Sequence, residues 1–133
     1  MCVCNNHFAQ ERPITFSIAN PHYLINETRK KHGLPPLSRS FELDEAARNH
    51  ASIMAKEDGL YYFDCSLPIY ASQLSMNVAY SSSILEAHHL MIETNYERQN
   101  ILSKKFHSVG VGASLGPDGF YYVCYMFFIS KKW

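Results

Sequence analysis

The stretch that decides the fold is SVGVGASLGPDGFYYVCYMFF, residues 108–128, which predicts a β-hairpin. Small and apolar residues alternate over 108–115, Pro117-Asp118-Gly119 has the composition of a turn, and a second strand follows over 120–129. The second strand is apolar on both of its faces, whereas a sheet with one wet face alternates polar and apolar residues. We therefore expect this sheet to be covered on both sides. The glycines of the first strand are expected to relieve crowding against a helix.

A first helix is predicted over about 21–32. Asn20-Pro21 is a typical helix start, and Gly33 is a typical stop. Pro35-Pro36 cannot continue the helix, because each proline lacks the amide donor and restricts the residue before it. We expect a rigid connector there.

The second helix is the clearest element of the sequence. One apolar stripe at helical spacing contains Leu43, Ala46, Ala47, His50, Ala51, Met54 and Ala55. The charged residues, Asp44 among them, are expected to lie largely outside this stripe, and Gly59 is expected to end the helix. His50 is expected to be a buried, hydrogen-bonded histidine of the core.

A third helix over about 83–94 and a short helical turn over about 97–102 complete the predicted elements. Ser81-Ser82-Ser83 offers N-caps for the third helix, and residues 60–74 are expected to form a loop with aromatic anchors. Helices and a twice-covered sheet predict an α+β fold: a three-layer α/β/α sandwich around a small antiparallel sheet. Residues 1–19 are expected to be an N-terminal arm, and 20–133 to be one domain.

Composition excludes some classes of function. The 133 residues include 12 Lys+Arg and 12 Asp+Glu, with 47% hydrophobic residues, so the chain is expected to be globular and to lack the basic field that nucleic-acid binding needs. No apolar run reaches the roughly 18–20 residues of a membrane span. The start of the sequence has no recognisable signal peptide. Residence inside the cell, a truncated chain and a mature fragment all stay open.

The four cysteines limit the disulfide and metal-binding chemistry that the chain can support. Cys2-x-Cys4 is too tightly spaced for the usual metal knuckle and is expected to be a pair of thiols in the arm. Cys65 and Cys124 would close a long loop if they were bridged in a secreted protein. Free thiols, with Cys124 buried in a strand, are the favoured interpretation.

Several spacings together resemble a known family. Asn26-x-x-Arg29-x-x-x-Gly33-Leu34-x-Pro36-Leu37 precedes the apolar stripe, and Asn77-Val78-Ala79, Arg98-x-Asn100-Ile101-Leu102 and Val109-Gly110-Val111-Gly112 follow. Over roughly residues 20–129 this order resembles the CAP superfamily, or SCP domain, and is closest to its compact bacterial branch. The resemblance implies a CAP-like sandwich and, for many members, an extracellular location.

In that family a cleft beside the sheet usually carries histidines and acids that often hold a divalent metal. Here the matching positions are changed: Tyr62 and Glu97 stand where histidines are expected, and Met76 stands for the glutamate of the Gly-Glu-Asn motif. Met91 falls near the expected tryptophan. A phenol, a thioether and one carboxylate make a poor zinc site, so no metal and no cofactor are expected.

The resemblance sorts the polar residues into two sets. The cleft-lining set is Tyr62, Met76, Asn77, Glu97, Arg98 and His107, and the structural set is Asn26, Arg29 and Asn100. His107 and Glu97 would make a weak acid–base pair if they met. Asn77 is expected in the loop before the third helix, and the adjacent His88 and His89 cannot easily chelate one ion on a helix.

Three functions are compatible with this sequence. The leading hypothesis is a non-catalytic binding or interaction module, not an enzyme, that has a CAP-like fold with a degenerate cleft and is expected to be a monomer. Its ligand would be an unidentified protein or a small apolar molecule. The alternatives are a metal-binding protein or hydrolase that uses Glu97, His107 and Tyr62, and a lipid or sterol binder that uses the aromatic surface near residues 60–70.

Overall fold

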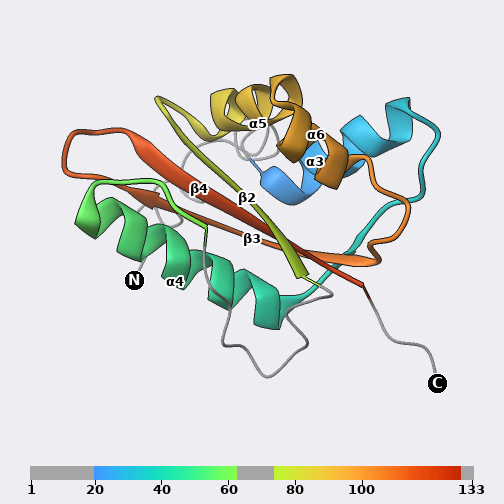
Figure 1. The fold of residues 1–133 in the computed structure, drawn as a ribbon, viewed down its shortest axis with the longest axis horizontal. Helices are drawn as coiled ribbons and strands as arrows, with labels where there is room; N and C mark the ends of the chain where they lie inside the picture. Colours follow the sequence, from blue (N-terminus) through green and yellow to red (C-terminus); the bar gives the residue numbers. More distant parts are fainter. Residues whose placement is uncertain (1–19, 63–73, 130–133) are drawn as a thin grey trace.

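The computed structural model describes residues 20–62 and 74–129, and within them the chain forms four helices and a four-stranded sheet (Figure 1). The elements in chain order are α3 (Pro21–Lys31), β1 (Ser38–Arg39), α4 (Phe41–Glu57), β2 (Leu74–Ser81), α5 (Ile84–Glu93), α6 (Asn95–Ile101), β3 (Ser108–Leu115) and β4 (Tyr121–Phe128). The expected arm, Cys65 and most of the expected loop lie outside the described residues.

The strands are ordered β1-β3-β4-β2 in one mixed sheet. The predicted hairpin is present: β3 and β4 are antiparallel, with Ser108 opposite Phe128. β2 pairs antiparallel with β4, whereas the two-residue β1 runs parallel to β3. The sheet is therefore not purely antiparallel, and β2 is a strand that the sequence analysis treated as loop.

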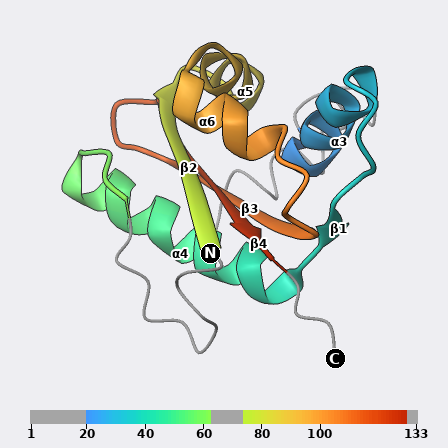
Figure 2. The same cartoon turned by 45° about the vertical axis from the view of Figure 1, so that its right-hand side comes forward.

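The two faces of β4 pack into two separate cores. Val123, Tyr125 and Phe127 belong to the cluster under α3, α5 and α6, and Tyr122, Cys124 and Met126 belong to the cluster under α4. Figures 1 and 2 show the same layers, with α4 on one side of the sheet and the other three helices on the opposite side. The predicted three-layer α/β/α sandwich is confirmed.

Helix α4 lies unusually close to β3. A Cβ atom added at Gly110 would lie 2.2 Å from the backbone carbon of Leu43, and one at Gly112 would lie 2.2 Å from the backbone nitrogen of Arg48. Both contacts are impossible for a real side chain. The glycines are therefore required by the approach of the helix backbone, as expected from the sequence.

The helix ends follow from capping residues. Asn20, Ser40 and Ser83 are the N-caps of α3, α4 and α5, and each side chain accepts a hydrogen bond from a backbone amide of the first turn. The C-terminus of α4 differs from the prediction. Asp58, not Gly59, has the left-handed conformation, with φ of 59°, which a short polar side chain tolerates better than most.

Two further expectations concern single features. Among residues 20–62 and 74–129, no helix is long and apolar enough to cross a membrane. Cys124 is a buried free thiol, and burial raises its pKa.

Candidate functional site

Two adjoining hollows lie beside β2, the edge strand of the sheet. One, of about 250 Å³, is lined by Tyr62, Thr94, Tyr96 and Glu97. The other, of about 260 Å³, is lined by Leu60, Val78, Ala79, Tyr80, Leu90, Met91, Thr94 and Glu97. Because the two share Thr94 and Glu97, they form one surface depression, called the β2 cleft below. Figure 2 shows how α5 and α6 lie over β2 at this edge.

Glu97 and Tyr62 meet in the β2 cleft. The Tyr62 hydroxyl donates a hydrogen bond of 2.5 Å to Oε2 of Glu97. Burial and the Glu97 carboxylate raise the pKa of Tyr62, so the phenol stays protonated and acts as a donor. Tyr62 also forms an edge-to-face pair with Tyr96, with ring centroids 5.7 Å apart and planes at 86°. Two aromatic rings and one carboxylate thus share a small space.

Two asparagines hold Glu97 in position. The Asn77 side chain, fully buried on β2, donates to the backbone carbonyl of Glu97 at 3.0 Å and accepts from the Asn100 amide at 2.8 Å. Asn77 therefore bonds backbone as expected, but from a strand, which corrects its expected place in a loop. These contacts support a structural role for Asn100 and fix α6 against the edge strand.

Arg98 is directed away from Glu97. Its guanidinium donates to the carbonyl of Ile92 at 3.0 Å and to Oδ1 of Asn95 at 2.5 Å. Both partners lie at the junction of α5 and α6, so the guanidinium of Arg98 ties the two helices together. In these contacts it is not paired with the carboxylate of Glu97.

Met76 and His107 lie elsewhere. Met76 is buried in the core cluster under α4, on the opposite face of β2 from Asn77. His107 is exposed before β3, where its backbone joins the carbonyl of Phe128 and the amide of Ser38. The described contacts therefore bring together Tyr62, Asn77 and Glu97 from the expected cleft set, and do not unite them with Met76 or His107.

The donors at the β2 cleft do not fit the divalent metal that the family resemblance implies. The Tyr62 phenol is protonated and bonded to the carboxylate, and the Met76 thioether faces the α4 core. Over residues 20–62 and 74–129, no three His, Cys, Asp or Glu side chains gather as a metal site. One carboxylate leaves most of the coordination shell of zinc to water.

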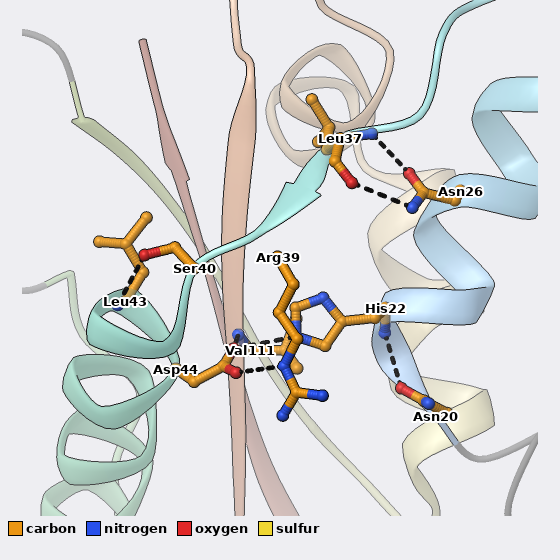
Figure 3. A network of polar contacts seen from close by, with 9 residues as sticks. All are labelled: Asn20, His22, Asn26, Leu37, Arg39, Ser40, Leu43, Asp44 and Val111. Carbon is orange, nitrogen blue, oxygen red and sulfur yellow. Dashed lines mark hydrogen bonds and ion pairs between the residues drawn. The ribbon is translucent and has the colours of Figure 1, made fainter. Parts of the chain in front are cut away.

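A second polar cluster, far from the β2 cleft, was missed by the sequence analysis. Asp44 lies on α4 but is only 2% exposed. Its Oδ2 accepts from Arg39 at 2.7 Å, and its Oδ1 lies 2.9 Å from both His22 Nε2 and the Val111 amide (Figure 3). The hydrogen bonds outweigh the effect of burial and lower the pKa of Asp44. Its expected place outside the buried stripe was wrong.

The Asp44 cluster joins α3 and α4 to β1 and β3, and two other side chains fix α3 to the connector that follows it and to the end of α6. Asn26 makes paired hydrogen bonds with the backbone of Leu37. The buried Arg29 donates to the carbonyls of Pro35, Ile101 and Ser103 at 2.8–2.9 Å. Contacts to backbone carbonyls support the structural role expected for both residues.

The buried histidines are also fixed by contacts within the fold. His50 contacts the carbonyl of Tyr61 at 2.8 Å. His88 lies 2.9 Å from both the Thr28 and Tyr125 hydroxyls, and burial lowers its pKa to about 4. The tautomer of each ring determines which of its nitrogens donates a hydrogen bond and which accepts one. Both rings are buried in the core, as was expected for His50.

Known structures share this fold. An outer surface protein from Borrelia burgdorferi is 13% identical with a TM-score of 0.74, covering 86% of this chain and 93% of that one. An extracellular protein containing an SCP domain from Bacillus anthracis is 20% identical with a TM-score of 0.65, covering 90% of this chain and 44% of that one. Venom allergen-like protein 4 from Schistosoma mansoni is 15% identical with a TM-score of 0.58, covering 87% of this chain and 88% of that one.

Sequence comparison is consistent with that likeness. A search of curated proteins finds no match. The family model described as "CAP: Cysteine-rich secretory protein family" matches residues 22–126, which include most of α3 and most of β4. The wider boundary at 20–133 stays a prediction. On this match, which spans most of the chain, the protein belongs to the CAP, or cysteine-rich secretory protein, family.

Proposed function

We propose that this chain is a non-catalytic binding module that has lost the metal chemistry of the CAP cleft and keeps the cleft as a binding surface. The observation that carries the proposal is the hydrogen bond between Tyr62 and Glu97. It joins the two positions where the resemblance implies histidines. A protonated phenol occupies one lone pair of the carboxylate there, which disfavours a bound metal and a free general base alike.

The surroundings of Glu97 also favour binding over catalysis. Among the described residues, the cleft walls are mainly aromatic and aliphatic side chains, such as Leu60 and Tyr96, and the carboxylate of Glu97 is hydrogen-bonded to a tyrosine rather than to a histidine. His107, the other expected acid–base residue, precedes β3, and its backbone bonds to Phe128 and Ser38. Acyl transfer through a nucleophilic side chain needs that nucleophile, a base that activates it and oxyanion donors held in one place.

Titration calorimetry with Zn²⁺ at neutral pH, on protein without a His-tag, tests this proposal. We expect no saturable heat at micromolar zinc. The matched variants are Glu97→Gln in the cleft and Glu93→Gln on the exposed face of α5. Binding tighter than about 10 μM in the original protein, lost in Glu97→Gln and kept in Glu93→Gln, would overturn the binding-module proposal and favour the metal hypothesis.

Restoring histidines tests the placement of the cleft positions. The double variant Tyr62→His, Glu97→His puts two imidazoles where a phenol and a carboxylate now touch, and we expect it to gain measurable zinc affinity. Met76→Glu is a poor addition, because it would bury a charge in the core under α4. A folded double variant that still ignores zinc would show that the two side chains do not occupy the family's ligand positions.

A further inference from the structure

The buried Glu97 carboxylate has no cation paired with it among the described residues. Only 6% of the residue is exposed, and within residues 20–62 and 74–129 its carboxylate receives a single hydrogen bond, from Tyr62. The adjacent cation, Arg98, is engaged at Ile92 and Asn95. A buried ionised carboxylate is costly unless it is paired or well hydrogen-bonded. A positive charge placed in the hollow would therefore be stabilised.

The walls around this carboxylate select the kind of cation. Tyr62 and Tyr96 are about half exposed and stand at 86° to each other, forming a corner beside Glu97. The face of an aromatic ring attracts cations through its quadrupole, and aromatic side chains line the sites that recognise quaternary ammonium groups. A metal ion would instead require several oxygen ligands, which this corner lacks among its described residues.

The size of the hollow limits the ligand. About 250 Å³ is smaller than the roughly 300–1,000 Å³ of pockets that enclose drug-sized molecules. The second hollow is lined mainly by apolar side chains, Leu60 and Leu90 among them, and shares Thr94 and Glu97 with the first. A compact charged head group fits this arrangement better than a whole sterol does.

We propose that the β2 cleft binds the trimethylammonium group of a choline-type ligand, with Glu97 supplying the charge and Tyr62 and Tyr96 supplying the aromatic walls. This inference rests on the proposed function, because it names the ligand chemistry of the same binding module. The Tyr62 hydroxyl holds the carboxylate in place, and the cation approaches the oxygen, Oε1, that Tyr62 leaves open.

Amide chemical shifts of the protein, titrated with choline chloride at constant ionic strength, test the proposal. We expect saturable shifts at Thr94, Tyr96 and Glu97. The neutral isostere of choline, in which a tert-butyl group replaces the trimethylammonium group, should bind at least tenfold more weakly. Equal shifts with the two compounds, or no saturation with choline, would overturn the proposal.

Variants separate the charge from the rings. Glu97→Gln keeps the acceptor for Tyr62 and the backbone bond from Asn77, so it should fold and weaken choline binding at least tenfold. Tyr96→Ala should weaken binding several-fold, whereas Glu93→Gln, on the exposed face of α5, should stay within about threefold of the original protein. A Glu97→Gln variant that binds choline normally would refute the role of the charge.

Two further readouts identify the source and separate this inference from the proposed function. If phosphatidylcholine vesicles sediment the protein but not its Glu97→Gln variant, the choline group belongs to a lipid. If the protein binds free choline but does not sediment with the vesicles, the ligand is a soluble molecule. Absence of choline binding together with absence of zinc binding refutes only the choline inference. Zinc binding that depends on Glu97 refutes the proposed function itself.

Discussion

The close approach of α4 to β3 makes Gly112→Ala the sharpest test of the fold. A Cβ at this position would lie 2.2 Å from the backbone nitrogen of Arg48 and 2.5 Å from the backbone carbon of Ala47, where real contacts essentially never fall below 3.0 Å. These are helix backbone atoms, so no side chain can rotate away. Helix α4 must retreat from the sheet along its length.

The magnitude follows from two opposing effects. Overpacking a core costs about 1–3 kcal/mol, and the backbone contact places Gly112→Ala at the upper end. Replacing glycine also restricts the unfolded chain, which stabilises the protein by about 0.4–1 kcal/mol. We therefore expect the free energy of unfolding to fall by about 2–3 kcal/mol.

Urea unfolding followed by circular dichroism measures this change, and Gly59→Ala is the matched control. The nearest atom to a Cβ at Gly59 is 4.0 Å away and its φ is not in the left-handed range, so this variant should be neutral or up to about 1 kcal/mol more stable. A Gly112→Ala protein within about 0.5 kcal/mol of the original would refute the close-packing argument, as would equal losses in the two variants.

Two further predictions concern buried polar groups. Asp44→Ala leaves the Val111 amide without its acceptor and should lower the free energy of unfolding, measured in urea, by about 2–4 kcal/mol. The control, Glu45→Ala at an exposed neighbouring position, should lower it by less than about 0.5 kcal/mol, and equal losses would contradict the buried network. Burial lowers the pKa of His88 to about 4, so between about pH 6.5 and 4 the unfolded state binds a proton that the folded state does not. The free energy of unfolding should therefore fall by about 3 kcal/mol as the pH falls through this window, and His88→Gln should flatten the dependence. Identical pH profiles for the two proteins would refute this prediction.

The hairpin and α4 could be predicted from sequence because their signals are local. The turn at residues 117–119 and the apolar pattern around it specify β3 and β4, and the stripe of α4 repeats at helical spacing. β2 has no such signal. The side-chain amide of its central residue, Asn77, is satisfied in the core by Glu97 and Asn100, which lie 20 and 23 residues later in the sequence.

The burial of Asp44 escaped prediction for the same reason. Its partners, His22, Arg39 and Val111, lie on α3, β1 and β3, and no spacing in the sequence indicates that these elements converge on one carboxylate. Acids in the first turn of a helix, here Glu42 and Asp44, are ordinarily solvent-exposed and stabilised by the helix dipole.

The candidate site was predictable in part. The family resemblance assigned Tyr62 and Glu97 to the same cleft, although they are 35 residues apart. The hydrogen bond between them depends on the path of the chain after α4, which the sequence does not specify. Tyr96 was not singled out, because a single exposed aromatic residue beside a buried glutamate has no distinguishing pattern.

The hydrogen bonds of Arg29 join segments that are synthesised at different times, and this limits when α3 can reach its final packing. Of its three carbonyl partners, Pro35 is close in sequence, but Ile101 and Ser103 are 72 and 74 residues away. As the chain leaves the ribosome, α3 is made before α6, yet the buried guanidinium of Arg29 has to wait for Ile101 and Ser103 before its hydrogen bonds are complete. Such distant pairings close only after a large loss of chain entropy. Any fragment that stops before Ser103 therefore leaves this charge without one of its hydrogen-bond acceptors, so α3 is synthesised before the other described helices and is among the last of them to be fixed in place.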